Sequence, residues 1–175
     1  MVDFVIINSK EDTNDFLNII DGFNSSNILI NPSKGAVRKL LKESNNDIVF
    51  CGHGDELGLY NKDLNGYVIN SNDVQLLRNH NIIGIWCFAG NFADRYDLHG
   101  FFTSMFISNI DEANYFNFNT TPDIITAENV KFSTMINELL KKQIPYSEWV
   151  DILQKQANTH IPFVRFNYEA LYYNK

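Results

Sequence analysis

Two reactive side chains each follow a short apolar stretch of the sequence. The stretch Ile48-Val-Phe-Cys-Gly-His53 ends with an imidazole and is followed by Gly54, and the stretch Ile82-Ile-Gly-Ile-Trp-Cys87 ends with a thiol. A thiol with the ordinary pKa of ~8.5 is mostly protonated at neutral pH, and a neighbouring imidazole can stabilise the thiolate or accept its proton. Together, His53 and Cys87 are suited to nucleophilic attack on a carbonyl carbon.

Attack on a carbonyl also creates an oxyanion, which backbone N–H groups must already face. Gly54 follows the histidine and has no side chain to obstruct such an approach, while Gly52 lets the chain turn sharply before it. The glycines around His53 therefore fit the same chemistry as the dyad.

Strands are the elements that must position these residues. After Asp47, the segment Asp47–Gly52 is continuously apolar, as is Ile82–Cys87, which is typical of strands in a sheet that is covered on both faces. In such sheets, ligands bind beyond the carboxyl ends of the strands. If the two strands are neighbours, ~4.8 Å apart, the imidazole and the thiol converge on one substrate.

The rest of the chain predicts one α/β domain over residues 1–175, with a mostly parallel sheet between helix layers. Further strands are expected at 3–8, 27–30, 101–107 and 163–173, and a loop or small hairpin at 55–70. Helices are expected at 16–23, at 73–78, along the apolar stripe 132–140, and from Ser147 to about Asn158. A further helix is expected after Ser33, which would be its cap, and Ser71 or Asn72 would cap the helix at 73–78.

Composition narrows the class of protein. The 175 residues are 45% hydrophobic and 14% aromatic, which is enough for a packed core. The net charge of −7 argues against nucleic acid as a partner, and no leader or apolar run suggests secretion or a membrane. Two cysteines are too few for a disulfide framework, so we expect reduced thiols and a cytoplasmic location.

The two motifs, in this order, resemble those of the caspase-like cysteine peptidases, the group of caspases, clostripain, gingipains, legumain, separase and the bacterial CHAT domains. Gly58-Leu-Tyr60 and the expected helix at 73–77 also look like the segment between the motifs in CHAT-like members. The resemblance covers roughly residues 3–112. It implies a caspase-like sheet and a cysteine endopeptidase that forms a thioester acyl-enzyme, without a cofactor, on a peptide or protein substrate.

The resemblance also implies roles for particular residues. His53 would be the acid–base residue and Cys87 the nucleophile, with the amides of Gly54 and Cys87 as the oxyanion hole. Ser108 and Asp111 follow the fifth strand, where related enzymes build part of the specificity pocket. His53 and Cys87 are 34 residues apart, which is closer than in caspases, and Ile85-Trp86 carries no sign of Asp or Arg specificity.

Other interpretations remain beside the peptidase. The chain is alternatively a degenerate caspase-like interaction or signalling module without activity. An unrelated nucleotide-binding α/β domain is disfavoured, because Asn8-Ser-Lys-Glu11 stands where a glycine-rich turn would follow the first strand. The sequence leaves a regulatory partner and homo-oligomerisation open.

Individual residues also have simpler interpretations. Cys51 is expected to be a packed strand residue, with a regulatory disulfide to Cys87 as the alternative. A zinc site from Cys51, His53, Cys87 and His99 has a spacing that fits no common zinc pattern. Asp55 and Glu56 are either candidates to orient His53 or solvated loop carboxylates, and Ser108 and Asn109 are candidate helix caps.

Overall fold

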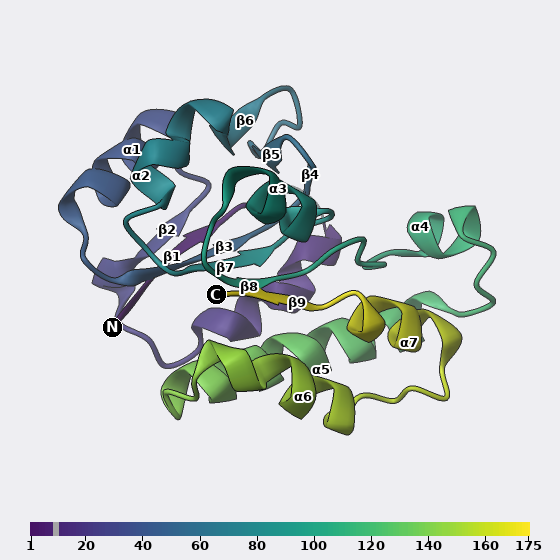
Figure 1. Cartoon of the computed structure of the whole chain (residues 1–175). Helices are drawn as coiled ribbons and strands as arrows, with labels where there is room; N and C mark the ends of the chain where they lie inside the picture. The colour runs from purple at the N-terminus through teal and green to yellow at the C-terminus, as the bar shows by residue number, and fades with distance from the viewer. Residues whose placement is uncertain (9–10) are drawn as a thin grey trace.

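A six-stranded sheet organises the molecule. The computed structural model describes residues 1–8 and 11–175, without the side chains of 11 and 12. The strands lie in the order β2-β1-β3-β7-β8-β9 (Figure 1). Their bounds are Val2–Ile6 (β1), Ile28–Ile30 (β2), Asp47–Cys51 (β3), Ile82–Ile85 (β7), Gly100–Phe102 (β8) and Tyr172–Asn174 (β9). All neighbours are parallel except β8 and β9, which confirms the predicted single α/β domain with a mostly parallel sheet.

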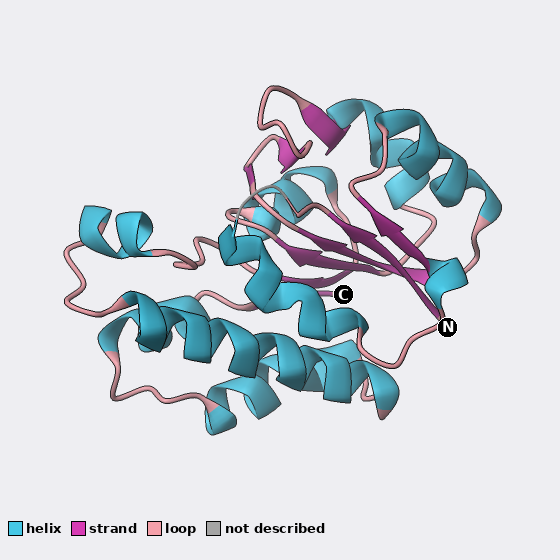
Figure 2. Ribbon diagram, turned by 180° about the vertical axis from the view of Figure 1, so that it is seen from behind, coloured by secondary structure: helices cyan, strands magenta, loops and turns pink. Residues whose placement is uncertain are grey.

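Helices cover both faces of this sheet (Figures 1 and 2). One face packs against α1 (Lys34–Glu43), α2 (Val74–Leu77) and α3 (Ala89–Tyr96). The other packs against the 3-10 helix η1 (Glu11–Ile20), α5 (Pro122–Lys141), α6 (Tyr146–Gln156) and α7 (Pro162–Glu169). Because successive strand residues point to opposite faces, the apolar run of β3 supplies both layers: Ile48 and Phe50 face α1, whereas Val49 and Cys51 face α5.

The helix caps agree with the sequence only in part. Ser33 caps α1, as predicted, by accepting from the Ala36 amide at 3.2 Å. The short helix begins as a 3-10 turn, η3 (Ser71–Asp73), and its cap is Asn70 rather than Ser71 or Asn72. Asp73 completes the capping box and, fully buried, also pairs with Lys34 and Arg38 of α1. These ion pairs tie the short helix to its neighbour.

The stretch predicted as a loop or hairpin forms a second, antiparallel sheet. Its strands are β4 (Gly54–Asp55), β5 (Gly58–Tyr60) and β6 (Tyr67–Asn70). Tyr60 and Tyr67 stack across this sheet with ring centroids 5.0 Å apart. We call these three strands the arm, because they form their own sheet beside the carboxyl end of the main one.

The strand predicted for residues 163–173 is wrong in its larger part. Residues 162–169 form α7, and only Tyr172–Asn174 pair as β9. Pro162 favours the first turn of a helix, and Phe163, Val164, Asn167 and Tyr168 are buried together on one side of it. Their aromatic and β-branched character suggested a strand, but helical packing against the core decided the outcome.

Three smaller predictions also need correction. The fifth strand, expected at 101–107, is limited to Gly100–Phe102. The helix expected at 16–23 is a 3-10 helix that ends at Ile20. Ser147 lies within the first turn of α6, after Pro145, and is not its cap.

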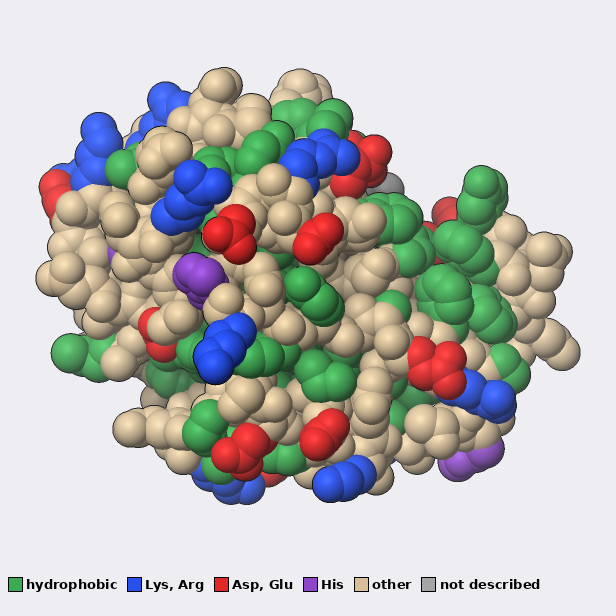
Figure 3. All heavy atoms as spheres, in the orientation of Figure 1, with side chains coloured by type: hydrophobic (Ala, Val, Ile, Leu, Met, Phe, Trp, Pro, Cys, Tyr) green, Lys and Arg blue, Asp and Glu red, His purple; other side chains and the backbone are tan. Residues whose placement is uncertain are grey.

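The short helix α4 (Ile110–Tyr115) stands apart from both layers (Figure 1). An aromatic cluster of Tyr115, Phe116, Phe118 and Phe166 connects it to α7, and apolar side chains gather on this side of the surface (Figure 3). A further 3-10 turn, η2 (Ser25–Asn27), precedes β2. In the described part of the chain, no helix has the length and apolar character needed to span a membrane.

Candidate active site

The two motifs end side by side at one edge of the sheet. β3 and β7 are adjacent and parallel, with Cys51 opposite Ile85, and the Gly52 amide donates to the Ile85 carbonyl at 3.1 Å. Cys51 and Ile85 both face the layer of η1 and α5. His53 and Cys87 each follow two residues later. The predicted adjacency of Asp47–Gly52 and Ile82–Cys87 is therefore confirmed.

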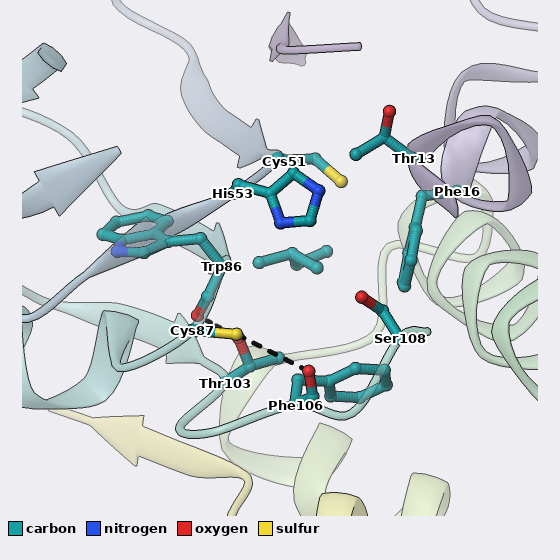
Figure 4. Close-up of a pocket in the computed structure, with 11 residues that line it drawn as sticks. Thr13, Phe16, Cys51, His53, Trp86, Cys87, Thr103, Phe106 and Ser108 are labelled. Carbon is teal, nitrogen blue, oxygen red and sulfur yellow. Dashed lines mark hydrogen bonds between the residues drawn. The ribbon is translucent and has the colours of Figure 1, made fainter. Parts of the chain in front are cut away.

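A pocket lies where these strands end. It encloses about 350 Å³ of space, including its open mouth. In Figure 4, the His53 ring and the Cys87 sulfur both face it, and Phe16, Phe106 and Ser108 close it from the other side. Its lining consists of Thr13, Phe16, Cys51, Gly52, His53, Ile85, Trp86, Cys87, Thr103, Phe106 and Ser108. The main sheet, η1 and the segment after β8 together build this pocket.

Cys87 sits in a tight connection between a strand and a helix. β7 ends at Ile85 and α3 begins at Ala89, with Phe88 in the left-handed region at φ 65°. The amides of Phe88 and Gly90 donate to the carbonyls of Ser104 and Thr103 at 3.0 and 2.8 Å. These bonds pin the turn to the segment after β8, so the chain holds Cys87 at the start of α3.

Cys87 therefore lies two residues before Ala89, the first residue of α3. A helix N-terminus carries partial positive charge and favours the thiolate form of a nearby cysteine. Cys87 is half-buried, and its Sγ donates to the Phe106 carbonyl at 3.5 Å (Figure 4). The sulfur is therefore oriented by its surroundings and still reaches the pocket.

Cys51 has the opposite environment. It is 3% exposed within the core, and burial raises the pKa of its thiol to about 12. No disulfide joins Cys51 to Cys87 in this structure. Cys51 is the packed strand residue that its position within the apolar run suggested.

The chain around His53 depends on two glycines. A Cβ on Gly52, whose φ is 154°, would lie 2.8 Å from the Cβ of Ile7. A Cβ on Gly54 would lie 2.3 Å from Cδ1 of Trp86. Larger residues would force the His53 segment away from the sheet.

The Gly54 amide, expected in the oxyanion hole, lies outside the ladder between β4 and β5. The Tyr60 amide donates to the His53 carbonyl at 2.9 Å, and Gly54 faces Leu59 in register. Gly54 thus occupies a non-hydrogen-bonded position of the antiparallel pair, and its N–H points away from β5. Gly54 itself does not line the pocket, although Gly52 and His53 do.

Of the two residues expected in the specificity pocket, Ser108 and Asp111, the structure places only Ser108 at the pocket. Ser108 lines the pocket, and its amide donates to Glu112 Oε2 at 2.7 Å. Asp111 is exposed on α4 and is not part of the lining. Asn109, a predicted cap, does cap α4 by accepting from the Glu112 amide at 2.9 Å.

The Asp55 carboxylate is directed into the arm. It accepts from the hydroxyls of Tyr60 and Tyr67 at 2.7 and 2.9 Å, and from the Leu57 amide at 2.8 Å. Partial burial raises its pKa, but these hydrogen bonds outweigh burial and leave the pKa below its ordinary value. Asp55 therefore stabilises the arm through hydrogen bonds within it.

Sequence reasoning missed Thr13, Phe16, Thr103 and Phe106 as pocket residues. Thr13 and Phe16 belong to η1, which follows the carboxyl end of β1, and Thr103 and Phe106 follow β8. Since all parallel strands end at the same edge, the residues after β1 and β8 were open to the same argument as His53 and Cys87.

The four residues of the alternative zinc site do not assemble. Among residues whose side chains the structure describes, no three His, Cys, Asp or Glu form a group that could hold a metal ion. His99 is exposed and away from the pocket lining.

Comparisons of the chain with protein-family models, curated protein sequences and solved structures find no match. The fold and the candidate site therefore define the class of protein. It is an α/β domain with a mostly parallel sheet flanked by helices. At the carboxyl edge of that sheet, a histidine and a cysteine share one pocket.

Proposed function

We propose that the chain is a caspase-like cysteine endopeptidase in which His53 and Cys87 form the catalytic dyad. One observation carries the proposal: the two residues follow paired positions of adjacent parallel strands and line the same pocket. Cys87 also precedes a helix N-terminus, the kind of environment in which reactive cysteines occur.

The proposed reaction is acyl transfer through the sulfur. His53 accepts the Cys87 thiol proton, and the thiolate attacks the carbonyl carbon of the scissile bond. The resulting oxyanion is bound by the amides of Gly54 and Cys87. Next, the C–N bond breaks, His53 gives its proton to the leaving amine, and a thioester remains on Cys87. Water, deprotonated by His53, hydrolyses the thioester and restores the thiol.

The residues that line the pocket indicate which substrate side chain it would accept. Phe16, Ile85 and Phe106 supply apolar surface, and three hydroxyl residues, Thr13, Thr103 and Ser108, supply polar groups. This lining favours a peptide whose side chain at the cleaved bond is apolar or small and polar.

One contact favours the second candidate function, a caspase-like interaction or signalling module without activity. The Cys87 thiol donates to the Phe106 carbonyl, which stabilises the protonated form of the sulfur. An inactive protein would keep this contact and the fold. Such a protein would act by binding a partner rather than by cleaving a peptide.

A peptide-library cleavage assay under reducing conditions separates the two candidates. The peptidase predicts cleavage by the wild type, none by Cys87→Ala, and retained cleavage by the control His99→Ala, because His99 is exposed and away from the pocket lining. Chelators should leave the rate unchanged. If the folded wild type cleaves nothing in a diverse library, the peptidase proposal fails and the binding module remains.

A further inference from the structure

Trp86 connects the two halves of the candidate site. It directly precedes Cys87, and its indole Nε1 donates to the carbonyl of Asp55 at 3.1 Å. Asp55 lies two residues after His53. One side chain thus spans from the cysteine turn to the histidine segment.

The Trp86 side chain packs on the opposite face of the main sheet from the Ile85 side chain. Trp86 belongs to the core layer of α1, α2 and α3, whereas Ile85 belongs to the layer of η1 and α5. The ring packs against two glycines: a Cβ on Gly54 would lie 2.3 Å from its Cδ1, and one on Gly84 would lie 2.7 Å from its Cζ3. Both glycines provide the space that the indole occupies beneath the His53 segment.

Both ends of Trp86 are fixed. Its carbonyl accepts from the Thr103 hydroxyl at 2.8 Å, and Thr103 is fully buried. Trp86 itself is 2% exposed, and its ring meets Phe92 of α3 edge-on at 6.0 Å. Because Trp86 is held in this way, its indole N–H fixes the position of the Asp55 carbonyl relative to the turn that carries Cys87.

The residue at the other end, Asp55, is held by several hydrogen bonds. The carbonyl that receives the indole N–H belongs to Asp55, whose carboxylate is held by Tyr60 and Tyr67. The arm is a separate sheet with no strand in the main one. His53 lies at the joint between the two sheets, where β3 has ended and β4 begins. The Trp86–Asp55 hydrogen bond crosses that joint.

We propose that Trp86 is a positioning residue, whose indole N–H sets the His53 segment relative to Cys87. The inference rests on the proposed dyad and adds the arm to the site, because the hydrogen bond from Trp86 holds Asp55 of the arm next to the cysteine turn. Without the N–H, the arm keeps its internal bonds but loses its hydrogen bond to the residue before the nucleophile. The imidazole then no longer keeps a fixed distance from the sulfur.

The test compares two tryptophan variants. Trp86→Phe keeps an aromatic ring and removes the donor. Trp149→Phe is the matched control, because Trp149 is also buried and its Nε1 also donates to a carbonyl, that of Ile144 at 2.9 Å. Trp149 lies on α6, outside the pocket lining. Each variant therefore loses one buried indole hydrogen bond.

The readout is the rate of Cys87 alkylation by iodoacetamide as a function of pH, measured by mass spectrometry. We expect Trp86→Phe to slow alkylation about tenfold at neutral pH and to remove its dependence on His53, tested with His53→Ala in both backgrounds. Trp149→Phe should keep the wild-type profile. Thr103→Val, which removes the hydroxyl that holds the Trp86 carbonyl, should shift the rate in the same direction as Trp86→Phe.

The outcomes separate the inference from the proposed function. If alkylation in the wild type does not depend on His53, the dyad itself fails. If it does depend on His53, but Trp86→Phe or, where that variant does not fold, Thr103→Val keeps the full rate and dependence, the positioning role is overturned. An equal loss of rate in Trp86→Phe and Trp149→Phe would also overturn it, since general destabilisation would then explain both.

Discussion

Cys51 and Ile85 face each other in register on adjacent parallel strands. His53 and Cys87 each stand two residues beyond this pair, so both leave the sheet at the same level and toward the layer of η1 and α5. The convergence of an imidazole and a thiol is thus a consequence of strand register. A register shift of one residue would turn one of the two side chains to the opposite face.

The two cysteines should differ widely in reactivity. Burial raises the pKa of Cys51 to about 12, whereas half-buried Cys87 lies at the start of α3. We expect iodoacetamide to modify Cys87 at least ~100-fold faster than Cys51 near neutral pH. Peptide mapping by mass spectrometry gives both rates in one sample. Equal rates would contradict the assignment of Cys87 as the activated thiol.

The same two positions should differ in stability when truncated. Cys87→Ala removes a half-buried sulfur at a turn, and we expect a change of less than about 0.5 kcal/mol in the free energy of unfolding. Cys51→Ala removes core packing and should cost about 1–2 kcal/mol. Urea unfolding measures both. A large loss in Cys87→Ala would mean that inactivity of this variant reflects misfolding rather than a missing nucleophile.

Alkaline pH should destabilise the fold through Cys51. The folded thiol, with a pKa of about 12, stays protonated, while the unfolded thiol ionises near ~8.5. Above that pH the unfolded state loses a proton that the folded state keeps, so stability falls as pH rises, by at most about 1.4 kcal/mol per unit. Urea unfolding between about pH 8 and pH 10 should give a steeper decline in wild type than in Cys51→Ala. Parallel curves would contradict the burial argument.

His80 should matter for folding and not for the site. It is 6% exposed, and its Nδ1 and Nε2 lie 2.8 and 3.0 Å from the carbonyls of Asn46 and Leu41. His80→Ala removes the ring and leaves at least one of these carbonyls without its donor, which should cost about 1–3 kcal/mol. His99→Ala, at an exposed position, should change stability by less than about 0.5 kcal/mol. Thermal unfolding compares them, and similar values would refute a structural role for His80.

The sequence by itself determined the sheet and the two ends that meet in the pocket. The apolar runs within β1, β3 and β7 are short and bounded by polar residues, which is typical of central strands in a sheet that is covered on both faces. Because parallel strands end at one edge, the sequence alone predicts that His53 and Cys87 lie together. The cap of α1 was equally local, since Ser33 bonds within its own turn.

Tertiary structure alone decided how the site is held. Trp86 bonds to a residue 31 positions away, and Phe16 and Phe106, from segments far apart in the chain, close the same pocket. Such contacts depend on how separate segments pack, which no local pattern specifies. The C-terminal segment shows the same limit: Phe163 and Tyr168 are as compatible with a strand as with a helix, and burial against the core selected the helix.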